Sequence, residues 1–104
     1  MALTGRLALH EELCTLLGSR NVYFRPTDHT KMKYPAITYE RSNMDVRFAD
    51  NNPYLTYDAY TVTIVDEDPD SEFVEKLTHF PMSRFSRHYT ADGLNHDVFT
   101  IYHK

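Results

Sequence analysis

Histidine is the residue type in this chain with the widest chemical range, because an imidazole can bind a metal ion or exchange a proton near neutral pH. The sequence has six histidines, and two of them, His88 and His96, lie near Asp97 in its C-terminal part. A small metal-dependent hydrolase could use these three residues if one hairpin brought them together. Zinc sites are typically marked by short ligand spacing or several cysteines, and the chain has neither. Structural hydrogen bonding or solvent exposure is therefore the favoured interpretation.

The densest acidic run extends from Asp66 to Glu72, and its alternating carboxylates resemble a calcium-binding loop. An EF-hand loop starting at Asp66 would need glycine at the position of Ser71 and glutamate at that of Leu77. A calcium site is therefore disfavoured. The stretch 68–71, Asp-Pro-Asp-Ser, is instead typical of a helix start, because aspartate can cap amides, proline is tolerated there, and acids suit the positive end of the helix dipole.

One stretch, Arg84 to Tyr89, combines basic and aromatic side chains that could stack on and clamp nucleic acid. The formal net charge of the chain is −4 and its pI is near 5.8, so the molecule lacks a positive field that would attract phosphates. An edge strand protected by charge is the simpler interpretation. An adaptor that binds nucleic acid through this strand is kept as an alternative.

Other sources of chemistry are scarce. Cys14 is the single cysteine, and its leucine neighbours suit a small buried apolar side chain. Three glycines leave little material for a phosphate-binding loop or a nucleophile elbow. No apolar run approaches the length that crosses a bilayer, and the N-terminus lacks a signal-peptide core. We expect a chain folded in a cytosol that is not an enzyme and uses no metal or cofactor.

The elements that position these residues follow from apolar spacing and turn residues. Residues Thr4 to Leu17 are predicted to form a helix with a leucine-rich face, ended by Gly18. Val22 to Phe24 could be a short strand or irregular. Two strands are clearer, since apolar and polar residues alternate in Tyr34 to Glu40 and in Tyr57 to Val65.

The C-terminal part completes a strand, helix, strand, strand module. A helix is expected from about Pro69 to His79, with Pro81 stopping it. Strands are expected from Arg84 to Thr90 and from Val98 to Tyr102, joined through a turn at residues 91–93. These patterns predict an α+β fold, with an antiparallel sheet of about four strands and two helices packed on one face. With 104 residues, we expect a single domain over 1–104.

The connection from Arg41 to Tyr54 is longer than most hairpin loops, and loops of this kind are usually functional or mobile. A mobile hairpin tip is one interpretation. The other is an arm that becomes ordered against a partner. For the second case the candidate interface residues are Arg41, Met44, Asp45, Val46, Arg47, Phe48, Asp50 and Tyr54.

Four stretches together resemble a known family. They are residues 34–40 (Tyr-Pro-Ala-Ile-Thr-Tyr-Glu), the loop 45–53, residues 60–63 leading into 68–71, and residues 87–102. Their layout is similar to that of the small neck proteins of long-tailed bacteriophages, the tail-terminator or tail-completion proteins of the head-to-tail joint. The resemblance extends from about Leu13 to the C-terminus.

This resemblance implies a virion structural protein, assembled in the host cytoplasm, that forms a ring, typically of six subunits. Such a ring caps the tail tube and connects it to the head. The implied partners are further copies of the chain, the tail-tube protein and the head connector, with no membrane. DNA would pass through the lumen without specific binding, and a net charge of −4 agrees with that. A head-completion, stopper-like neck protein is the alternative in the same class.

Overall fold

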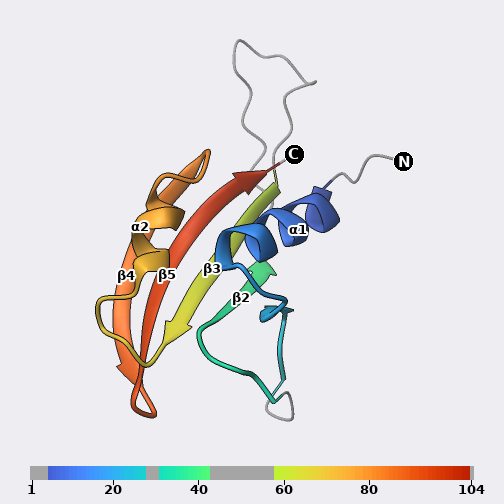
Figure 1. Cartoon of the computed structure of the whole chain (residues 1–104). Coiled ribbons are helices and arrows are strands. Elements are labelled where there is room, and N and C mark those ends of the chain that lie inside the picture. The colour runs from blue at the N-terminus through green and yellow to red at the C-terminus, as the bar shows by residue number, and fades with distance from the viewer. Residues whose placement is uncertain (1–4, 28–30, 43–57, 104) are drawn as a thin grey trace.

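In the computed structural model, which describes residues 5–27, 31–42 and 58–103, the chain forms an α+β fold with two helices and one five-stranded sheet (Figure 1). The strand order across the sheet is β1-β2-β3-β5-β4. The elements in chain order are α1 (Gly5–Leu17), β1 (Val22–Phe24), β2 (Ala36–Arg41), β3 (Asp58–Asp66), α2 (Glu72–Thr78), β4 (Ser83–Ala91) and β5 (Leu94–His103).

The sheet differs from the predicted one in strand number and direction. β1 forms a fifth strand and runs parallel to β2, whereas every other neighbouring pair is antiparallel, so the sheet is mixed. The short pairing is extended at both ends, because Ile37 N donates to Asn21 O at 3.0 Å and Arg25 N donates to Tyr39 O at 2.9 Å. Burial of Val22 against the helices adds an apolar contact to this edge.

Both helices cover the same face of the sheet, as predicted (Figure 1). The face alternation predicted for β3 is confirmed, since Tyr60, Val62 and Ile64 are fully buried beneath the helices while Thr61 and Thr63 are half-buried on the other face. One continuous core joins the sheet to both helices. Its members are Leu9, Leu13, Cys14, Leu17, Val22, Ile37, Tyr39, Tyr60, Val62, Ile64, Leu77, Phe99 and Ile101.

Helix α2 starts later than the sequence predicts, at Glu72 with Ser71 as its N-cap. The Ser71 hydroxyl accepts a hydrogen bond from the amide of Phe73 at 3.4 Å. The aspartates before it hold the connecting loop instead, because Asp66 Oδ1 accepts from the amide of Asp68 and Asp68 Oδ1 accepts from that of Asp70. The expectation of a helix from Pro69 is therefore wrong by about one turn.

The C-terminal hairpin is longer than predicted. β5 begins at Leu94 rather than Val98, and β4 covers nine residues. The turn lies at Asp92 and Gly93, whose φ angles of 54° and 74° suit a tight two-residue connection. A register shift between Phe85 and Arg87 leaves Ser86 as an extra residue in β4.

Candidate functional site

Neither helix covers the opposite face of the sheet, where threonines and charged residues lie beside the buried Val65 and Val98. Register brings side chains of four strands into rows across this face. One row consists of Glu40, Thr61, Thr100 and Arg84, which lie on β2, β3, β5 and β4 respectively. The two threonines of this row and the charged residues beside them make the open face suited to a protein contact through hydrogen bonds rather than to an apolar ligand.

Strand β4 forms one edge of the sheet and is exposed along almost its whole length (Figure 1). Its apolar members are unusually exposed, Phe85 at 49% and Tyr89 at 40%, and Met82 just before the strand is 54% exposed. Arg87 lies over the Tyr89 ring at 5.3 Å. An exposed edge strand presents backbone groups that can pair with another chain, and its arginines and bulge limit indiscriminate pairing.

Three arginines line a surface hollow at the other side of the sheet. Arg6 from α1, Arg25 after β1 and Arg41 at the end of β2 surround it together with Phe24 and Glu40, and its volume is about 520 Å³. We call these five residues the arginine hollow. Three guanidinium groups against one carboxylate make its lining positively charged, so it suits an anionic group.

Contacts with aromatic rings hold two of these arginines in place. The Arg6 guanidinium lies 4.4 Å from the centroid of the Phe24 ring, and its Nη1 donates to the Tyr39 hydroxyl at 3.2 Å. Arg41 lies 5.8 Å from the centroid of the Tyr60 ring. Guanidinium groups fixed in this way lose less side-chain entropy when they bind an anion.

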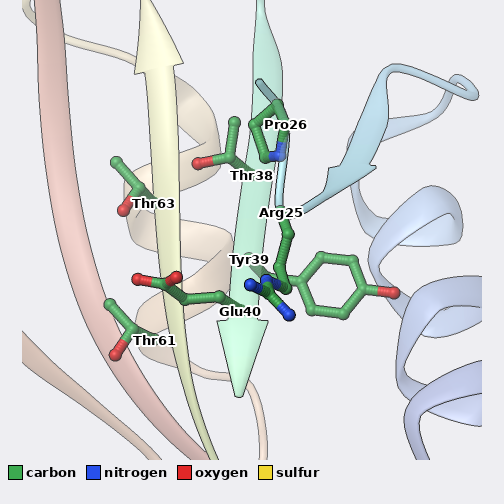
Figure 2. A pocket seen from close by; sticks show the side chains of 7 residues that line it. All are labelled: Arg25, Pro26, Thr38, Tyr39, Glu40, Thr61 and Thr63. Atoms are coloured by element: carbon green, nitrogen blue, oxygen red, sulfur yellow. The ribbon is translucent and has the colours of Figure 1, made fainter. Parts of the chain in front are cut away.

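A smaller hollow of about 200 Å³ adjoins the first and shares Arg25 and Glu40 with it. Figure 2 shows the residues that line it, with the Tyr39 ring directed away from the threonines and toward α1. Thr61 and Thr63 contribute from β3, so the positive end of the molecule merges with the polar open face. The hollow contains hydroxyl, carboxyl and guanidinium groups.

The acidic loop, residues 66–70, lies at the opposite end of the strands from the arginine hollow. Glu67, Asp68 and Asp70 are exposed in it. Beside it lies a hollow of about 450 Å³, whose lining includes the carboxylates of Asp70, Glu75 and Asp97. This end of the molecule is therefore negatively charged.

The predicted histidine and aspartate group does not assemble. His88 Nδ1 lies 2.7 Å from Asp97 Oδ1 on the helix side of the sheet, and Asp97 is 7% exposed. His96 projects from the other face, where it stacks on Tyr89 with ring centroids 4.6 Å apart. The nearby Ser71 hydroxyl is used in the helix cap. His88, His96 and Asp97 therefore do not share one site as the hydrolase alternative requires.

Within residues 5–27, 31–42 and 58–103, no three His, Cys, Asp or Glu side chains are placed to share a metal ion. Neither of the two helices in these ranges has the length and apolar content needed to span a bilayer.

Of the predicted interface residues, the structure describes Arg41 alone. Arg41 is the last residue of β2 and pairs in register with Tyr60, so it belongs to a strand and not to the loop that was expected to begin with it. The remaining seven lie outside the described residues, namely Met44, Asp45, Val46, Arg47, Phe48, Asp50 and Tyr54.

Sequence reasoning missed the arginine hollow, because its arginines are far apart along the chain and meet only through the parallel pairing of β1 with β2. No family model, curated protein or solved structure matches the chain.

Proposed function

We propose that this chain is a virion structural protein, a ring-forming tail terminator that stops growth of the tail tube and joins the tail to the head. The proposal starts from the resemblance of residues 34–40, 45–53, 60–63, 68–71 and 87–102 to the tail-terminator family. A ring subunit needs at least two unlike surfaces for its neighbours and further surfaces for the structures above and below it. The chain offers distinct candidates for these roles.

The observation that carries the proposal is the exposed edge strand β4 next to an uncovered sheet face. β4 offers an exposed edge strand nine residues long, with Phe85 and Tyr89 among its exposed side chains. A strand of a tube or connector protein could add to this edge, with main-chain hydrogen bonds giving affinity and side chains giving specificity. We assign β4 and the adjoining open face to the partners of the ring.

A structural role also agrees with the distribution of the polar groups. The His88 and Asp97 pair forms one hydrogen bond between strands β4 and β5, and His96 lies on the other face. β4 contains arginines, but the chain as a whole has a net charge of −4. This negative charge favours contacts with proteins over contacts with nucleic acid. Contact between proteins is therefore the function that these surfaces support best.

The test is the length of tail tubes assembled in the presence of this protein. Purified tail-tube protein is allowed to polymerise with and without the chain, and tube lengths are measured by electron microscopy. We expect shorter tubes that carry the protein at one end. Tubes of equal length under both conditions would contradict the proposal, and binding to the connector without binding to tubes would favour the head-completion alternative.

A substitution on β4 sharpens the test. Phe85→Lys places a charge at the exposed edge and should weaken tube capping. The substitution also removes the edge-on contact between Phe85 and Phe99, whose ring centroids are 5.4 Å apart. Leu7→Lys is the matched control, because Leu7 is 51% exposed and lies on α1. Circular dichroism verifies that both variants fold. Equal capping by the two variants would remove β4 from the contact surface.

A further inference from the structure

Charge is divided unevenly between the two halves of the molecule. Residues 5–42 carry six Lys and Arg against four Asp and Glu, whereas residues 58–103 carry three against nine. The net charges of these segments are therefore +2 and −6. β1 and β2 lie on one side of β3, whereas β5 and β4 lie on the other, so the two segments form opposite edges of the sheet (Figure 1).

The arginine hollow lies in the positive segment, and the acidic loop lies in the negative segment. Arg41 pairs with Tyr60 at the beginning of β3, and the acidic loop follows the end of β3. Asp66 is six positions after Tyr60 along the strand, a distance of about 20 Å at the usual rise of about 3.3 Å per residue. The two sites are therefore too far apart to meet within one copy of the chain.

Their chemistry is complementary. Guanidinium groups bind carboxylates through charge-assisted and often bidentate hydrogen bonds. The hollow has three guanidinium groups, and the loop presents the exposed carboxylates of Glu67, Asp68 and Asp70. Contact between two hollows, or between two loops, would oppose like charges. A second copy can therefore bring unlike charges together at these two sites only by placing its loop against the hollow of the first.

We propose that the arginine hollow of one copy binds the acidic loop of the next copy, so that copies associate head to tail. This inference rests on the ring proposed above and names the contact that forms it. In such a heterologous contact each copy uses two different surfaces, and a suitable rotation closes the copies into a ring. β4 and the open sheet face are then available to other proteins.

The experiment reverses the charges on each side and measures self-association by analytical ultracentrifugation. The hollow variant is Arg25→Glu/Arg41→Glu, which leaves Arg6 and its contacts with Phe24 and Tyr39 in place. The loop variant is Glu67→Lys/Asp70→Lys, which keeps Asp66 and Asp68 as acceptors of the backbone amides of the loop. Each variant should raise the dissociation constant of the assembly about tenfold or more.

Restoring the complementary charges is the decisive step. In an equimolar mixture, the loop of each variant can contact the oppositely charged hollow of the other variant. In a single chain that carries all four substitutions, the positive loop of one copy can contact the negative hollow of the next. Both samples should assemble again, and assembly should weaken as salt is raised. Lys31→Glu/Lys33→Glu is the matched control, because it makes the same change in net charge at exposed lysines outside the hollow. It should assemble like the original chain.

The outcomes separate this inference from the proposed function. Assembly that is insensitive to both reversals, or not restored by mixing, overturns the contact while the ring stands. An original chain that remains monomeric overturns both the contact and the ring. A short DNA duplex that binds the original chain but not the hollow variant, with self-association unchanged in that variant, assigns the hollow to phosphate groups and also overturns the proposal.

Discussion

At the scale of residues, the Tyr39 hydroxyl links the edge of the core to the arginine hollow. It accepts from Arg6 at 3.2 Å, and it lies 2.7 Å from His10 Nδ1. Burial raises the pKa of Tyr39 above its usual value, although Arg6 acts in the opposite direction. The hydroxyl therefore keeps its proton near neutral pH and can donate it to a neutral His10. Arg6, which lines the hollow, is held by this chain of contacts.

The first prediction concerns pH and His10. Burial lowers the pKa of His10 below 6.5, and the charges of Arg20 and Arg6 act in the same direction. The unfolded chain therefore binds this proton more readily than the folded one, so the contribution of His10 to stability is present above pH 6.5 and is lost as the pH falls through the lower folded value. We expect the free energy of unfolding to decrease with acidification across this window.

The measurement compares chemical denaturation of the original chain with that of His10→Gln at several pH values. The difference in free energy of unfolding isolates His10, because the other histidines are common to both proteins. We expect the slope against pH to be smaller in the variant. Identical slopes would show that His10 does not titrate with a lowered pKa.

A second prediction concerns the backbone at Met82, which has a φ of 60° and a side chain that is 54% exposed. Left-handed geometry is unfavourable for a residue with a side chain and costs glycine nothing. Met82→Gly should therefore raise the free energy of unfolding by about 0.5 kcal/mol, after the greater freedom of glycine in the unfolded chain is subtracted. Met82→Ala keeps the Cβ atom and is the control. An equal increase in the free energy of unfolding in Met82→Ala and Met82→Gly would contradict this explanation.

At the scale of elements, the sequence predicted a helix or strand correctly where the pattern of apolar and polar residues is long, but not where it is short. β3 is nine residues long, and the alternation from Tyr60 to Ile64 identified both faces correctly. The three residues of β1 are too few to establish a period of two. The sequence therefore did not decide whether Val22 to Phe24 form a strand, which is parallel to β2 in the structure. The start of α2 was misplaced because Asp68 and Ser71 are both residue types that cap helices, and only the folded contacts distinguish them.

The third prediction tests that cap. Ser71→Ala removes the acceptor of the Phe73 amide and should lower the free energy of unfolding by about 1 kcal/mol. Ser86→Ala, in the exposed bulge of β4, is the matched control and should have little effect. Denaturant unfolding of both variants gives the comparison. A larger loss in Asp68→Ala than in Ser71→Ala would mean that the helix begins at the earlier aspartate.

At the scale of the whole molecule, the fold separates a positive end, a negative end and an uncovered sheet face. The sequence predicted the α+β class and the helices on one face, since the apolar stripes can be buried together only in that way. It did not predict the arginine hollow, because Arg6, Arg25 and Arg41 meet through tertiary pairing and not through a local motif. We therefore propose self-association through unlike surfaces.

The native mass of the purified protein over a range of concentrations tests that central claim most directly. Each chain has a mass of 12.2 kDa, so a closed ring gives one species at a whole multiple of that value. We expect a single discrete assembly, of six copies if the tail-terminator proposal is right. A strict monomer at high concentration, with no assembly when tail-tube or connector protein is added, would contradict the account.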